Sequence, residues 1–171
     1  MTEKEFNHKI MPLARQVYSF ALNMTGNSED SADITQDVMI KLWDQRKELK
    51  QIKNPKAWAL KITRNLCLDW LKKCKPAYNE EEVIKNGGYD LDLLSRIESQ
   101  DVAQAVRQII NTLPDNQREV MILRELEEME FDEIAQITGL GLNNIRVLLS
   151  RGRSKVKEIL IKKYQISRFE S

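Results

Sequence analysis

Hydrophobic residues recur at helical spacing along almost the whole chain, and glycines and prolines fall at the junctions between these segments. Apolar positions three and four residues apart line one face of a helix, so the pattern predicts an all-α protein. Thr25-Gly26 should end the first helix, and Asn27 or Ser28 should cap the second. Arg46–Lys53 is expected to be a polar connector. The helices are predicted over residues 6–24, 28–45, 55–73, 102–112 and 115–128, with a further pair from 131 to about 160.

The stretch Phe131–Arg153 is typical of a helix-turn-helix. Ala135 offers the small residue, Gly139 the turn glycine and Ile145 the apolar anchor that two steeply crossing helices need. In the second helix one stripe is apolar, formed by Ile145, Leu148, Leu149, Gly152, Val156, Ile159 and Leu160. The opposite face carries donors and a methyl-bearing side chain suited to DNA bases and phosphates, namely Arg146, Val147, Ser150, Arg151, Ser154 and Lys157.

The helix predicted over 55–73 is a second informative element, with Asn54 as its cap and Pro55 at its first position. Its expected apolar wall contains Trp58, Ile62, Leu66 and Trp70, backed by Ala59, Leu60, Cys67 and Leu71. The remaining stripe carries Lys61, Arg64, Asn65, Leu68 and Lys72. A single basic, Asn-bearing stripe favours nucleic-acid contact, although a solvated face on a core helix is the alternative.

Between these segments the helical pattern weakens, and Glu80–Glu82 and Gly87-Gly88 suggest a flexible, charged linker. The predicted organisation is therefore two small helical domains, residues 1–75 and 99–171, joined by a linker over 76–98.

The formal net charge of +1 hides a strong segregation of charge. Residues 41–75 hold eleven Lys/Arg against three Asp/Glu, and residues 141–163 hold seven against one. Residues 79–101 hold seven acids against two bases, and residues 115–133 eight against two. Two basic blocks beside acidic ones indicate two DNA-facing surfaces and separate protein-facing surfaces.

The candidate chemistry argues against an enzyme or a metalloprotein. Cys67 and Cys74 match no common zinc or redox spacing, and His8 is the only histidine. There is no Gly-rich phosphate loop and no nucleophile with a partner base. No metal or cofactor is expected. No apolar run has membrane-spanning length and the N-terminus lacks a signal-peptide core, so we expect a cytoplasmic protein without membrane insertion.

Three motifs, in order, resemble a known family. SEDSADITQDVMIKLW (28–43) resembles region 2 of bacterial sigma factors, NPKAWALKITRNLCLDWLKK (54–73) the DNA-melting helix that follows it, and the run from Leu113 to Leu160 region 4. A chain with only these regions matches the small extracytoplasmic-function (ECF) group. The resemblance implies a dissociable subunit that directs core RNA polymerase to promoters and helps open them. It also implies core polymerase, promoter DNA and an anti-sigma factor as partners.

The resemblance also implies roles for individual residues. An acidic and amide-bearing face would bind the clamp coiled coil of the largest polymerase subunit; the matching residues are Asp33, Gln36, Asp37, Lys41 and Trp43. For Trp43, core packing is an equal alternative. The downstream (−10) element would be met by Lys61, Arg64, Asn65, Lys72 and Lys73. Asn65 is the candidate for base readout, and Lys72, Lys73 and Lys75 for phosphates. Arg46–Lys53 matches the loop that receives a flipped base. Trp58 could stack on a base, but its place on the apolar wall favours packing in the core.

In the C-terminal domain the recognition helix would read the upstream (−35) element. The matching residues are Asn143, Asn144, Arg146, Ser150 and Arg151, with Arg153 and Lys155 on phosphates. Arg118 and Arg124 would approach the backbone or pair with Glu119 and Glu125. The alternative function is a free-standing helix-turn-helix regulator that binds an operator as a dimer. It accounts for residues 131–153, but it leaves the stripe on 54–73 unexplained.

Overall fold

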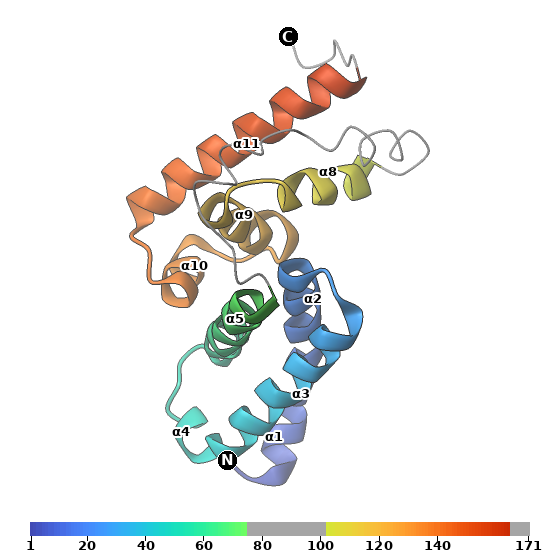
Figure 1. Cartoon of the computed structure of the whole chain (residues 1–171). Coiled ribbons are helices and arrows are strands. Elements are labelled where there is room, and N and C mark those ends of the chain that lie inside the picture. Colours follow the sequence, from blue (N-terminus) through green and yellow to red (C-terminus); the bar gives the residue numbers. More distant parts are fainter. Residues whose placement is uncertain (75–101, 165–171) are drawn as a thin grey trace.

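The computed structural model describes residues 1–74 and 102–164 (Figure 1). Within these two ranges every regular element is a helix and there is no strand, which confirms the predicted all-α class with two helical regions. The linker predicted over 76–98 lies outside the described residues. No helix in the described ranges is long and apolar enough to span a membrane.

The N-terminal part is built on three helices that pack against one another, α2, α3 and α5. Its core includes Phe20 from α2, Val38 and Leu42 from α3, and Leu60 from α5, all essentially inaccessible to water. Burial of such side chains stabilises a fold by roughly 1.5–3 kcal/mol each. The elements are α1 (Glu3–Lys9), η1 (Met11–Leu13), α2 (Ala14–Thr25), α3 (Ser28–Asp44), α4 (Arg46–Leu49) and α5 (Pro55–Cys74).

Two expectations for this part were wrong. The single helix predicted over 6–24 is divided into α1, a 3-10 turn and α2 at Pro12, whose ring removes a backbone donor and clashes with the preceding turn of an α-helix. The stretch Arg46–Lys53, predicted as a polar connector, instead begins with the short helix α4.

The predicted helix ends are confirmed. Gly26 ends α2 in the left-handed region with φ 68°, a conformation that glycine adopts without a Cβ clash. The Asn27 side chain accepts a hydrogen bond from the Asp30 amide at 3.0 Å, so Asn27 is the cap of α3. The Asn54 side chain caps α5 in the same way, accepting from the Ala57 amide at 3.0 Å.

The C-terminal part contains the predicted helix-turn-helix. The helix predicted over 115–128 is α-helical only to Met121 and continues as one π-helical turn, η3. Gly139 forms the turn between the two motif helices with φ 75°. The elements are α8 (Val102–Asn111), α9 (Asp115–Met121), η3 (Ile122–Leu126), α10 (Phe131–Thr138) and α11 (Leu142–Tyr164).

The apolar stripe of α11 packs on the rest of this part as predicted. Ile145 and Leu149 are buried, and α11 contacts α8, α9 and α10. Gly152 lies directly against α9: a Cβ added there would stand 2.7 Å from Cγ of Met121. The two helices approach this closely because position 152 has no side chain.

The two parts are in contact with each other. Figure 1 shows α10 and the turn after α9 lying against α5 and α2. The buried apolar residues of both parts form one continuous cluster. In this arrangement residues more than a hundred positions apart, such as Gln16 and Met129, are neighbours.

Candidate nucleic-acid interface

The outward face of α11 presents the predicted upstream set to solvent. Arg146, Ser150 and Arg151 are exposed, as are Asn143, Asn144 and Arg153, whereas Lys155 is half-buried. Val147 lies on the same face with 45% of its surface exposed, which leaves an apolar contact free for a thymine methyl group. The structure therefore brings this set together on one helix face.

Arg146 is positioned by neighbouring side chains. Its Nη1 donates to Oδ1 of Asn143 at 3.3 Å, and its guanidinium lies 5.6 Å from the centre of the Phe131 ring. The Arg124 guanidinium is 4.9 Å from the centre of the same ring. Cation–π contacts of this kind orient an arginine without neutralising it.

Two predicted phosphate contacts are held in ion pairs. Arg153 pairs with Glu125 at 2.6 Å, and Lys155 lies 3.6 Å from Glu158. Pairs at such exposed positions stabilise by only about 0.2–1 kcal/mol. Replacement of either carboxylate by a DNA phosphate therefore costs little free energy.

Arg118 and Arg124 do not pair with Glu119 and Glu125, contrary to that alternative. Arg118 lies 3.6 Å from Asp115, one turn away on α9. Arg124 donates to the backbone carbonyl of Met129 at 2.8 Å and lies 3.6 Å from Glu130.

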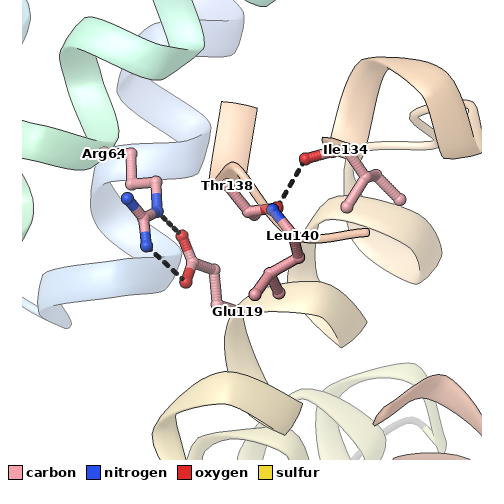
Figure 2. Close-up of polar contacts among 5 residues, drawn as sticks. All are labelled: Arg64, Glu119, Ile134, Thr138 and Leu140. Carbon is pink, nitrogen blue, oxygen red and sulfur yellow. Dashed lines mark hydrogen bonds and ion pairs between the residues drawn. The ribbon is translucent and has the colours of Figure 1, made fainter. Parts of the chain in front are cut away.

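The second predicted DNA surface, on α5, is only partly open. Lys61, Asn65, Lys72 and Lys73 are exposed, but Arg64 is half-buried and forms an ion pair with Glu119 of α9 (Figure 2). Its Nη2 donates to Oε2 of Glu119 at 3.3 Å. Lys72 is eleven residues beyond Lys61, or about 16 Å along the helix, so these cations are spread out. Lys75 lies outside the described residues.

Trp58 corrects the sequence interpretation. It was expected in the core, yet 36% of it is exposed and its Nε1 donates to Oε1 of Gln45 at 3.4 Å. The buried face of α5 is instead formed by small residues together with Leu60. Trp58 borders a cavity of about 380 Å³, which is also lined by Ile52, Lys53, Asn54, Ala57, Lys61 and Gln136.

This cavity combines an aromatic ring, two lysines and two amides, which are the groups that hold a single-stranded base and its backbone. Gln136 comes from α10, so the C-terminal part contributes to the cavity wall. The resemblance pointed to the loop Arg46–Lys53 as the receiver of a flipped base, and Trp58 was the less favoured stacking candidate because it shares the helical spacing of its apolar neighbours. The contribution of Gln136 from α10 was missed, since no local pattern places it beside this loop.

The predicted polymerase-binding face lies on α3. Asp33, Gln36, Asp37 and Lys41 are exposed there. Ile40 is 59% exposed beside them and was missed in the sequence. Trp43 is half-buried: its ring packs edge-on against Phe6 at 5.0 Å, and the Arg46 guanidinium lies 4.2 Å from its centre.

Over the described ranges, no three His, Cys, Asp or Glu side chains converge where a metal ion would bind.

Comparison with known proteins identifies the family. Residues 10–75 match the model of Sigma-70 region 2, and residues 103–156 match that of Sigma-70, region 4. The ECF RNA polymerase sigma factor SigW of Bacillus subtilis is 24% identical, over 85% of this chain and 83% of its own length. The chain belongs to the sigma-70 family, in its ECF group. The RNA polymerase sigma factor YlaC of the same organism is 29% identical over 164 residues, 90% of this chain and 92% of its own.

Two solved structures share the fold of this chain. RpoE, solved with the anti-sigma factor NepR from Bartonella quintana, superposes with a TM-score of 0.70 at 23% identity, over 92% of this chain and 97% of its own. CnrH, solved with the cytosolic domain of CnrY, gives a TM-score of 0.65 at 17% identity, over 93% and 89% of the two chains. This sigma factor thus directs core RNA polymerase to specific promoters and assists their opening at the start of transcription.

Proposed function

We propose that this sigma factor reads a bipartite promoter with residues 99–171 on the upstream element and residues 1–75 on the downstream element. The observation that supports this division most is the outward face of α11, where Arg146, Ser150 and Arg151 stand exposed together over a buried apolar stripe. Arginine bidentate to guanine is the commonest specific contact in a major groove, so Arg146 and Arg151 are the proposed base readers.

The downstream element is assigned to α5 and the cavity at its start. Asn65 and Arg64 contact bases, Lys61 holds the backbone, and Lys72 and Lys73 contact phosphates further along. A base extruded from the non-template strand enters the cavity of Ile52, Lys53 and Trp58, with Trp58 as the stacking surface.

The exposed face of α3 binds core polymerase. Asp33, Gln36 and Asp37 offer acceptors to a basic partner helix, Lys41 adds a donor, and Ile40 provides an apolar anchor. Trp43 supports this face from the side. The chain performs no catalysis itself, and it acts in the cytoplasm, where core polymerase works.

An anti-sigma factor is the further proposed partner. Two solved proteins of similar fold are bound in complexes, RpoE with an anti-sigma factor and CnrH with the cytosolic domain of CnrY. Native mass spectrometry of the chain purified from its own cells before induction tests this. A second protein bound in stoichiometric amount, whose removal restores transcription, supports the proposal. A chain that carries no bound protein contradicts it.

Transcription from a random promoter library tests the assignment of residues. With core polymerase and the purified chain, the sequenced transcripts should share an upstream and a downstream motif. Arg151→Ala should relax one upstream position at a cost of about 1–3 kcal/mol. Lys162→Ala is the matched control, because Lys162 is an exposed cation of the same helix that pairs with Glu158 at 3.0 Å. If Arg151→Ala weakened promoter recognition equally for all sequences, Arg151 would not be a base-reading residue.

A further inference from the structure

The ring of Phe131, the first residue of α10, lies beside two arginines from different elements. The Arg124 guanidinium in η3 is 4.9 Å from the ring centre, and the Arg146 guanidinium in α11 is 5.6 Å from it. A cation within about 6 Å of an aromatic ring is attracted by the negative face of its π system. Helix α10 also packs against both η3 and α11 (Figure 1). A single side chain therefore joins the recognition helix to the element that precedes the helix-turn-helix.

Arg124 is anchored to the segment between η3 and α10. Its Nη1 donates to the backbone carbonyl of Met129 at 2.8 Å and lies 3.6 Å from Oε2 of Glu130. The same segment contains Glu128 with φ 55°, in the left-handed region that residues other than glycine seldom adopt. Because its guanidinium has these partners, Arg124 is a fixed cation, and it holds the Phe131 ring in one place.

Arg146 is held by contacts that leave most of its donors available. It is exposed, and its contact with the Phe131 ring uses none of its N–H groups as hydrogen-bond donors to oxygen. One donor, on Nη1, faces Oδ1 of Asn143 at 3.3 Å. A guanidinium has five N–H donors, so enough remain for a bidentate pair with guanine. An arginine loses rotamer freedom when it binds a base, and the ring imposes part of this loss before DNA arrives.

The other proposed base reader, Arg151, offers an internal comparison. It is exposed on the same helix five residues later, or about 7.5 Å along the axis. In the part of the chain that the structure describes, no aromatic ring lies under its guanidinium. The orientation of Arg146 thus depends on a residue outside α11, whereas that of Arg151 does not depend on Phe131.

We propose that Phe131 is a positioning residue for promoter recognition: its ring, held by Arg124, orients the Arg146 guanidinium toward guanine and so sets the base preference at one upstream position. The side chain of Phe131 has no hydrogen-bonding group, so its effect on base choice passes through Arg146. This role rests on the proposed reading of a base by Arg146. Phe131 therefore determines specificity although it belongs to α10 and not to the recognition helix.

Transcription of a random promoter library by core polymerase with the full chain tests this role. Arg146→Ala identifies the upstream position that Arg146 reads. Phe131→Leu keeps an apolar side chain but removes the π face, and it should lower the preference for guanine at that position by about two- to fivefold. The preference at the position that Arg151 reads should not change. Phe131→Tyr keeps the ring and should retain the wild-type preference at both positions.

Thr138→Ala is the matched control for a general loosening of the helix-turn-helix. The Thr138 hydroxyl donates to the Ile134 carbonyl at 2.7 Å and accepts from the Leu140 amide at 3.2 Å (Figure 2). Its removal weakens the turn at the other end of α10 without changing the ring, so every base preference should be retained. A loss of guanine preference equal to that of Phe131→Leu would overturn the proposal. Circular dichroism checks folding, and Phe131→Met replaces Phe131→Leu if that variant unfolds.

The double variant Phe131→Leu with Arg146→Ala tests whether the ring acts through the arginine. Its base preferences should equal those of Arg146→Ala alone, because the group that the ring orients is already missing. A further loss of preference in the double variant would overturn the positioning role. Failure of the proposed function is distinguishable: Arg146→Ala would then change no upstream preference. If Arg146→Ala relaxes a position and Phe131→Leu does not, Arg146 still reads a base and only the role of Phe131 is overturned.

Discussion

Helices α5 and α11 carry similar basic stripes, but the two stripes differ in how far their arginines are exposed. On α11 the central arginines Arg146 and Arg151 are exposed over a packed apolar face. On α5 the central arginine, Arg64, is half-buried against Glu119. Of two similar basic stripes, one is therefore exposed and the other is partly covered by the rest of the chain. The difference lies in what packs on each helix, because Glu119 from the acidic block 115–133 lies against Arg64 of α5.

The strongest test of this comparison uses the two cysteines of α5. Burial, with the nearby Glu119 charge, raises the pKa of the Cys67 thiol from 9.0 to about 12. At pH 8 its thiolate fraction should be about a thousandfold below that of an ordinary thiol. Cys74, at the exposed end of the helix, should be alkylated by iodoacetamide first. Mass spectrometry of timed samples measures both rates, and comparable rates would mean that the covered side of α5 is open.

Removal of the two central arginines should change the free energy of unfolding by very different amounts. Arg64→Ala leaves the Glu119 carboxylate buried without its cation, and we expect the free energy of unfolding to fall by about 3 kcal/mol. Arg151→Ala removes an exposed side chain and should change it by less than about 0.5 kcal/mol. Urea titration followed by circular dichroism compares the two variants. An equal loss of stability would contradict the difference between the surfaces.

The same comparison shows which structural features the sequence predicts and which it does not. Helical spacing predicted the buried face of α11 from Ile145 to Ile159, because each of those residues packs within its own part. The caps at Asn27 and Asn54 were equally local and were predicted. Contacts between Arg64 and Glu119 join residues 55 positions apart, and no local pattern encodes that pairing.

Trp58 failed for a related reason. Its spacing places it with Ile62 and Leu66, but the side chains of α5 that are fully buried are those of Ala57, Ala59, Leu60, Thr63 and Cys67, so the period of the pattern was right and the predicted face was displaced around the helix. Pro12 was a simpler omission, since a proline inside a helical pattern is itself a signal for a break.

The exposed surface of α11 depends on close packing beneath it. Gly152→Ala would place a Cβ 2.7 Å from Cγ and 3.0 Å from Sδ of Met121, and the crowding should lower the free energy of unfolding by about 2 kcal/mol. Gly141→Ala is the matched control, because a Cβ there would meet nothing within 4 Å. The same urea titration measures both. An unchanged free energy of unfolding in Gly152→Ala would show that α9 can move away from α11. The packing beneath the exposed surface of α11 would then be less rigid than the structure indicates.

The smallest expected effect is an acid dependence of the contact between the two parts, where Glu133 of α10 accepts a hydrogen bond from Asn54. Burial raises the pKa of Glu133, but hydrogen bonds from the Glu130 backbone and the Asn54 amide, with the charge of Lys56, outweigh it, so the pKa lies below its ordinary value of 4.5. A carboxylate with a lowered pKa stabilises the folded contact above pH 4.5, and that contribution is lost as the pH falls through the lowered pKa. Pulsed electron paramagnetic resonance measures the distance between spin labels at Asn7→Cys on α1 and Lys157→Cys on α11, in a Cys74→Ser background, and this distance should begin to lengthen below pH 4.5. In Glu133→Gln, which has no proton to gain at this site, the lengthening should be smaller over the same range, whereas Asp132→Asn should follow the wild type. If the distance changes with pH in the same way in all three chains, Glu133 does not contribute to the contact between the two parts.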